Sequence, residues 1–92
     1  MKQIFKYTLK TISDPQSIEM PSGAVFLSLL VQRGDPNMWF LCDGDTTRPY
    51  EVRRFQLFAT GEPIPEPVAL GYLGAFHALT GSLVLHAFEV LV

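Results

Sequence analysis

The sequence predicts an all-β fold, a small single-domain β-sandwich or barrel of six to seven short antiparallel strands over residues 1–92. Apolar, aromatic and β-branched residues recur in segments of strand length. Turns that contain glycine and proline separate those segments, and no segment has a persuasive helical periodicity. A chain of 92 residues supports one domain.

The N-terminal third of the chain predicts three strands. QIFKYTLKT (residues 3–11) alternates, and one face of the strand carries Phe5, Tyr7 and Leu9. SIEMPSG (17–23) predicts a short strand that ends at the proline and glycine. AVFLSLLVQR (24–33) is a continuous apolar run, which predicts a fully buried strand ending at a GDPN turn (34–37).

The middle of the chain predicts a hairpin, a loop and a further strand. MWFLCD (38–43) follows the GDPN turn directly, so an antiparallel hairpin is expected there. GDTTRPY (44–50) is a polar loop, and EVRRFQLFAT (51–60) alternates as a strand. GEPIPEP (61–67) has three prolines in seven residues, which predicts an extended loop.

The segment from Val68 to Phe88 has 21 residues without Asp, Glu, Lys or Arg. This length is enough for a membrane-spanning helix, but glycines interrupt the run and no Lys or Arg flanks it. LTGS (79–82) is typical of a turn at its midpoint, and each half has strand length. The segment therefore predicts a β-hairpin.

Composition limits the partners and the compartment. A net charge of −2 with 17% charged residues argues against binding of long nucleic acid. The apolar fraction of 48% is high for so short a chain and favours a homo-oligomer that hides apolar surface. The single cysteine and the absence of a signal-peptide pattern at the N-terminus predict a cytoplasmic protein without disulfides.

Two histidines lie in the predicted C-terminal hairpin. A two-residue turn at Thr80–Gly81 would pair His77 with Val84 and His86 with Ala75, which puts both imidazoles on one face. A turn one residue longer would put them on opposite faces. Two histidines are too few for a zinc site, so no metal is expected. A hydrogen-bonded structural or ligand-contacting role is favoured.

Two adjacent arginines in the strand at residues 51–60 must point to opposite faces. Arg53 and Arg54 are candidates for binding an anion, since an arginine on an enclosed face needs a negative partner. A bound phosphate and a protein salt bridge to Glu51, Glu89 or Asp43 are equally compatible with the sequence. The sequence leaves open which arginine faces inward.

Other candidate ligand-binding residues carry weaker signals. Thr60 and Gly61 can form an anion nest at the end of a strand, although an ordinary turn is the commoner use of such a pair. Trp39 and Tyr72 can stack on a nucleobase, although both types more often pack in cores or interfaces. Cys42 and the serines lack the signature of a catalytic nucleophile, so no enzyme is expected.

Several segments together resemble a family of small phage and prophage proteins. The resemblance extends from Ile4 to Glu89 and follows the pattern MP-x-GA, TG-x-PI and H-x-F-E. The segments that carry it are IFKYTL, IEMPSGAVFLSLLVQRG, MWFLCD, RRFQLFATGEPIP, YLGAFH and LVLHAFE. The longer, arginine-bearing loop DGDTTRPY (43–50) departs from the pattern and leaves the identity of any ligand open.

The resemblance implies a phage anti-defence protein of the anti-CBASS sponge type. Such a protein is a homo-oligomer in the cytoplasm of the infected bacterium that sequesters a cyclic di- or trinucleotide signal without cleaving it and without a cofactor. The ligand-binding residues expected at matching motif positions are Gln32, Trp39, Arg53, Arg54, Thr60, Gly61, Tyr72 and His86. The alternative is a phage interaction protein that binds or inhibits a host or virion protein and has no small-molecule ligand.

Overall fold

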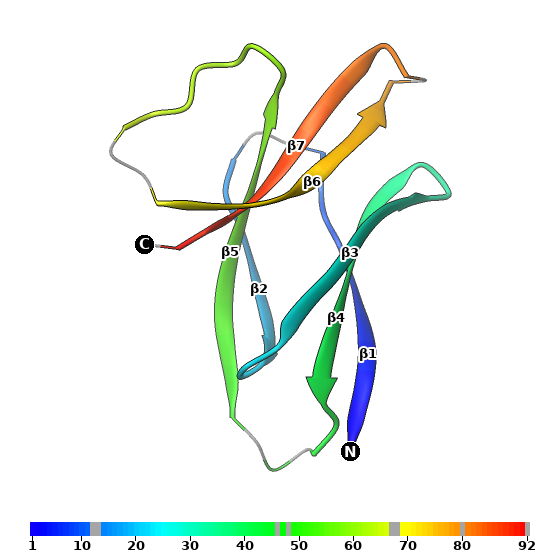
Figure 1. The fold of residues 1–92 in the computed structure, drawn as a ribbon, viewed down its shortest axis with the longest axis vertical. Helices are drawn as coiled ribbons and strands as arrows, with labels where there is room; N and C mark the ends of the chain where they lie inside the picture. The colour runs from blue at the N-terminus through cyan, green and yellow to red at the C-terminus, as the bar shows by residue number, and fades with distance from the viewer. Residues whose placement is uncertain (12–13, 46, 48, 67–68, 80, 92) are drawn as a thin grey trace.

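Figure 1 shows a computed structural model of the chain, which describes residues 1–11, 14–45, 47, 49–66, 69–79 and 81–91. The strands in these ranges are β1 (Lys2–Thr8), β2 (Gln16–Pro21), β3 (Val25–Gln32), β4 (Asp35–Asp43), β5 (Tyr50–Ala59), β6 (Leu70–Ala78) and β7 (Leu83–Val90). They form two antiparallel sheets, sheet A in the order β1-β4-β3 and sheet B in the order β2-β5-β7-β6. The predicted all-β class is confirmed, as an open sandwich and not a closed barrel.

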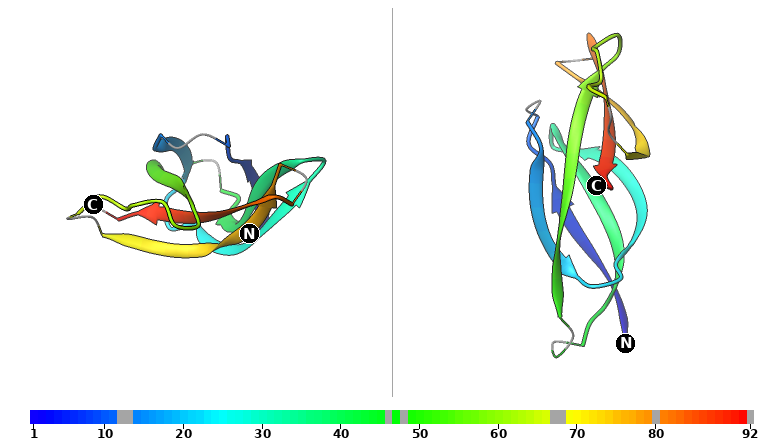
Figure 2. Two further views of the ribbon diagram at one scale, coloured as in Figure 1. Left: turned by 90° about the horizontal axis from the view of Figure 1, so that it is seen from above. Right: turned by 90° about the vertical axis from the view of Figure 1, so that its left-hand side faces the viewer.

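The two sheets pack against each other around an aromatic centre. The ring of Phe40 in sheet A makes edge-to-face contacts with Tyr7, Phe26 and Phe55, at centroid distances of 5.8, 5.6 and 6.0 Å. Phe40 and Phe55 are fully buried, so this contact joins the sheets at the middle of the core. The result is a flat molecule of 42 × 33 × 16 Å, whose two layers are visible from the side in Figure 2.

The C-terminal apolar segment forms the predicted hairpin, β6–β7. His77 pairs with Val84 and His86 pairs with Ala75, which confirms the register predicted from the sequence. Both histidines therefore lie on one face of sheet B. The turn itself includes Thr80, which lies outside the described residues. Among the residues described, no helix is long and apolar enough to cross a membrane.

The prediction that residues 24–33 form a fully buried strand is wrong. β3 pairs only with β4, at the edge of sheet A. One of its faces packs on the core, and no second layer of the described residues covers the other face. Val25 and Leu30 are accordingly 56% and 59% exposed. The continuous apolar run therefore forms a strand that is apolar on both faces, although only one of the two faces is covered by another layer.

The predicted GDPN turn is displaced toward the N-terminus. Arg33 and Gly34 form the two-residue turn between β3 and β4, and both have positive φ values, 54° and 84°. Such a pair matches the right-handed twist of the flanking strands. Pro36 and Asn37 instead belong to β4 and are buried.

A β-bulge in β6 changes the direction of Tyr72. The β6–β7 register shifts between Tyr72 and Gly74, so Tyr72 lies opposite Phe88 and Gly74 lies opposite Ala87. Gly74 has a φ of 145°, a conformation that side chains rarely adopt. Without the shift, Tyr72 would oppose Glu89 and point toward the core. The bulge therefore places Tyr72 on the same face as His86.

Candidate functional site

The outer face of sheet B gathers most of the polar and aromatic residues that the sequence singled out. Cross-strand pairing places the residues of β5, β6 and β7 on this face in successive rows. We call it the histidine face, and it is defined by Arg54, Gln56, Thr60, Tyr72, His77, His86 and Phe88.

A hydrogen-bonded chain of three side chains lies at the centre of the histidine face. The imidazole of His86 has its Nε2 2.8 Å from Thr60 Oγ1 and its Nδ1 2.9 Å from the Tyr72 hydroxyl. His86 is half-buried, whereas Tyr72 is 57% exposed. The Phe88 ring lies directly opposite Tyr72 on β7 and contacts it edge-to-face, with centroids 5.1 Å apart. The three polar groups are therefore fixed in orientation and reachable from solvent.

The chemistry of this chain is directional. A neutral imidazole donates from one nitrogen and accepts at the other, so one hydroxyl donates to the ring and the other accepts from it. Whichever tautomer is present, the two terminal hydroxyls of Thr60 and Tyr72 keep further hydrogen-bonding capacity on their outer sides. This hydrogen-bonded chain of side chains can therefore bind a polar ligand that stacks on Tyr72, because it combines contact with the ring and oriented hydrogen bonds.

Arg54 supplies the positive charge of the histidine face. It lies opposite Val90, one row from the Gln56–Phe88–Tyr72 row and about 7 Å from it along the strand. Within the described part of the chain, Arg54 has no hydrogen-bond or ion-pair partner. It borders an open hollow of ≈ 350 Å³ at the end of sheet B, which is also lined by Glu51 and by the ion pair of Arg53 with Glu89. A solvated guanidinium beside an aromatic platform is suited to an anion.

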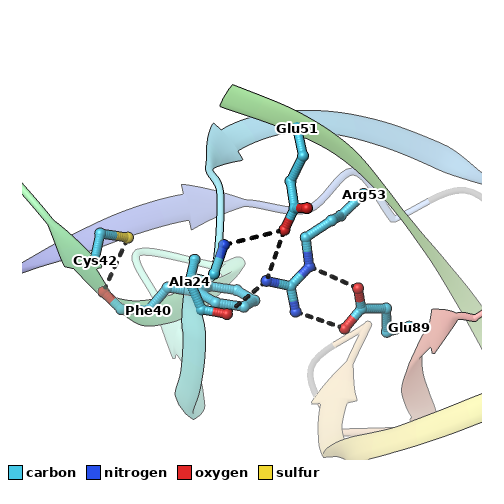
Figure 3. Close-up of polar contacts among 7 residues, drawn as sticks. Ala24, Phe40, Cys42, Glu51, Arg53 and Glu89 are labelled. Atoms are coloured by element: carbon cyan, nitrogen blue, oxygen red, sulfur yellow. Dashed lines mark hydrogen bonds and ion pairs between the residues drawn. The ribbon is translucent and has the colours of Figure 1, made fainter. Parts of the chain in front are cut away.

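Arg53 points to the opposite side of sheet B and has protein partners. Its Nε and Nη2 donate to the two carboxylate oxygens of Glu89 at 2.7 and 2.8 Å, and its Nη1 donates to the Ala24 carbonyl at 2.5 Å (Figure 3). The guanidinium also lies 5.1 Å from the centre of the Phe40 ring, and a Glu51 oxygen lies 3.9 Å away. Of the alternatives open from the sequence, Arg53 thus adopts the protein salt bridge.

The other two predicted ligand-binding residues lie on sheet A. Trp39 is half-buried on the outer face of that sheet, between Lys6 and Ser28 in the register. Gln32 lies on the same face, where its side-chain oxygen accepts a hydrogen bond of 3.1 Å from Lys6 Nζ. One chain therefore joins Thr60, His86 and Tyr72 in direct contact, with Arg54 two rows from His86 on the same face. Gly61, with a φ of 86°, lies in the turn after β5, where the Glu62 N–H donates to the Ala59 carbonyl. Gln32 and Trp39 lie in the other layer.

Two residues of the histidine face were missed from the sequence. Phe88 and Gln56 lie directly opposite each other, and Phe88 also faces Tyr72. The period-two alternation that places Phe88 on the same face as His86 was available as a signal. The pairing of Gln56 with Phe88 was not, because it depends on the register between distant strands.

Cys42 is not placed for nucleophilic chemistry. Its side chain is 1% exposed and its sulfur lies 3.7 Å from the Phe40 carbonyl oxygen. Burial raises the pKa of the Cys42 thiol, which disfavours the reactive thiolate at neutral pH. The described residues also contain no group of three or more His, Cys, Asp or Glu side chains that could hold a metal ion.

Comparison with known proteins identifies the family and no function. Neither a curated protein nor a solved structure matches the chain. The model of a domain of unknown function, DUF7352, matches residues 1–91, which is nearly the whole chain. The chain therefore belongs to the DUF7352 family.

Proposed function

We propose that this chain is a phage anti-defence protein that binds and sequesters a cyclic nucleotide signal of the host, without cleaving it. The observation that carries the proposal is the joint placement of Arg54, Tyr72, His86 and Thr60 on one face of sheet B. A cyclic dinucleotide presents phosphates and bases, and this face offers a partner for each. The assignment to phages comes from the sequence resemblance.

In the proposed complex each part of the histidine face has a separate task. A base lies on the exposed ring of Tyr72, which Phe88 contacts edge-to-face from the neighbouring strand. The Thr60 and Tyr72 hydroxyls, oriented by His86, bond to the polar edge of the base or to a ribose hydroxyl. Arg54 holds a phosphate from the neighbouring row. Apposition with another subunit would enclose the ligand and raise the affinity.

Binding without chemistry is favoured by the nature of the third group. A Thr–His pair acts as nucleophile and base when a carboxylate on the other ring nitrogen stabilises the imidazolium. Here that position is held by the phenol of Tyr72, which orients the ring but carries no negative charge. Sequestration requires only a Kd in the nanomolar range, or about −12 kcal/mol, which contacts in a desolvated pocket can supply.

The test is a thermal-shift screen of the purified protein against cyclic di- and trinucleotides and isomers of cyclic ADP-ribose. At 100 times the Kd a ligand adds about 2.7 kcal/mol of stability, which raises the Tm by on the order of 10 °C in a domain this small. The bound compound is then released by heating and identified by mass spectrometry. Recovery of the compound intact supports sequestration, and recovery of an altered compound indicates an enzyme instead.

Matched variants locate the site. Tyr72→Ala removes the platform and Arg54→Gln removes the charge, so each should lower the affinity by tenfold or more, about 1.4 kcal/mol. Gln32→Ala, on the other sheet, is the control and should leave the affinity unchanged if one chain forms the site. If no compound shifts the Tm of the wild-type protein, the proposal fails, and capture of a host or virion protein becomes the experiment of choice.

A further inference from the structure

We propose that a second copy of the chain docks on the outer face of sheet A, giving a symmetric dimer. This face, which we call the tryptophan face, is defined by Ile4, Lys6, Val25, Ser28, Leu30, Gln32, Trp39 and Leu41. Its apolar side chains are unusually open for a strand surface. Ile4, Val25 and Leu30 are 61%, 56% and 59% exposed, and they surround the half-buried Trp39.

The accessible surface of the chain is larger than that expected of a compact monomer. Its accessible surface is 5926 Å² for a mass of 10.3 kDa. A compact monomer of that mass is expected to expose about 5,350 Å². The excess, about 600 Å² by this scaling, follows from the flat 42 × 33 × 16 Å shape, in which two thin sheets leave both outer faces open. In the proposed dimer, a copy of the same chain on sheet A covers part of this open surface on both molecules at once.

The size of the face suits a modest dimer. Three strands about 4.8 Å apart, with seven to nine residues of about 3.3 Å each, make a footprint of about 400 Å². Two rough faces of this size bury on the order of 1,000 Å² in total, which lies at the lower limit of specific interfaces. Dissociation in the micromolar range is therefore expected, and Trp39 at the centre is the residue type that most often dominates such contacts.

Charge allows the two copies to meet. The ends of the tryptophan face carry charges of both signs, Lys2, Arg33, Asp35 and Asp43, and Lys6 lies beside Trp39. In a two-fold interface a basic group of one copy can therefore lie opposite an acidic group of the other. The proposal concerns sheet A and is independent of any ligand bound on sheet B.

The test follows the oligomeric state of the full chain across a dilution series. Sedimentation velocity gives the mass, and the emission of Trp39, the single tryptophan, reports its burial. We expect a dimer in the upper micromolar range that dissociates on dilution, with Trp39 emission moving to longer wavelength. Leu30→Glu and Ile4→Glu each put a charge on the face and should raise the dissociation constant by tenfold or more. Leu91→Glu, at a side chain 60% exposed at the end of sheet B, is the matched control.

Circular dichroism checks that each variant is folded, which is expected because the substituted positions are exposed. A loss of dimer can then be separated from a loss of fold. A wild-type protein that is monomeric throughout the series overturns the proposal, and the tryptophan face would then be open to a different protein. A dimer that Leu91→Glu disrupts while Leu30→Glu and Ile4→Glu do not also overturns it, since the interface would lie on sheet B.

Discussion

Replacing Glu89 by glutamine should cost the protein far more stability than a surface substitution does. The Arg53 and Glu89 side chains are 18% and 15% exposed, and they form a bidentate ion pair on the inner face of sheet B. Breaking a fully buried pair costs about 3–5 kcal/mol, because one charge is left without its partner. Residual solvent access and the one remaining amide oxygen reduce this to about 2 kcal/mol for Glu89→Gln. The Tm should fall by on the order of 10 °C.

A double-mutant cycle separates the ion pair from the packing of the two side chains. Arg53→Met leaves the Glu89 carboxylate and the Ala24 carbonyl oxygen without their hydrogen-bond donor. Together these two losses should lower the free energy of unfolding by about 3 kcal/mol. In the double variant Arg53→Met/Glu89→Gln the only carboxylate of the described residues left beside position 53 is that of Glu51, whose side chain is 43% exposed and can be hydrated. The loss in the double variant should therefore be smaller than the sum of the single losses by about 1–3 kcal/mol.

The assay is urea unfolding at neutral pH, followed by circular dichroism, with the m-value compared between variants. Hydrogen bonds to Glu89 are the main cause that raises the pKa of Arg53 above its ordinary value, so this side chain stays charged throughout. Val52→Thr on the same strand, at a side chain 59% exposed, is a control that should change stability by less than about 0.5 kcal/mol. Single losses that simply add, or a Glu89→Gln variant as stable as the control, would refute the coupling.

Three further predictions follow from particular contacts. Tyr72→Phe removes only the exposed bond to His86, so by urea unfolding it should cost less than about 1 kcal/mol, and a larger loss would mean a structural role. Gly74→Ala should cost about 1–3 kcal/mol because of the φ of 145°, and an unchanged Tm would contradict the bulge. Burial raises the pKa of Tyr7 from its ordinary value of 10.0 to about 12. The unfolded chain ionises first, so stability should fall as pH rises from about 10 to about 12, and tyrosinate absorbance in a Tyr7→Phe comparison tests this.

Most of the fold could be predicted from the sequence, because the alternation of side chains along a strand is a local property. The two faces of β1, the β6–β7 hairpin and the pairing of both histidines follow from period two and a single turn. The exposure of one face of β3 could not be predicted, since an apolar run is the same in a strand covered on both faces and in a strand covered on one face. The packing of the layers decides whether the second face is covered, and local pattern does not encode that packing.

For the candidate site too, some placements follow from local pattern and others depend on long-range pairing of strands. His86 and Phe88 share a face by alternation alone, but Tyr72 joins them only because one extra residue is inserted beside Gly74. By simple alternation from His77 and the hairpin turn, Tyr72 would face Glu89 and the core. Thr60 likewise reaches His86 across the β5–β7 pairing, which joins segments 26 residues apart. The sequence thus supplies the chemical groups of the histidine face, while a bulge and a distant register decide that they meet.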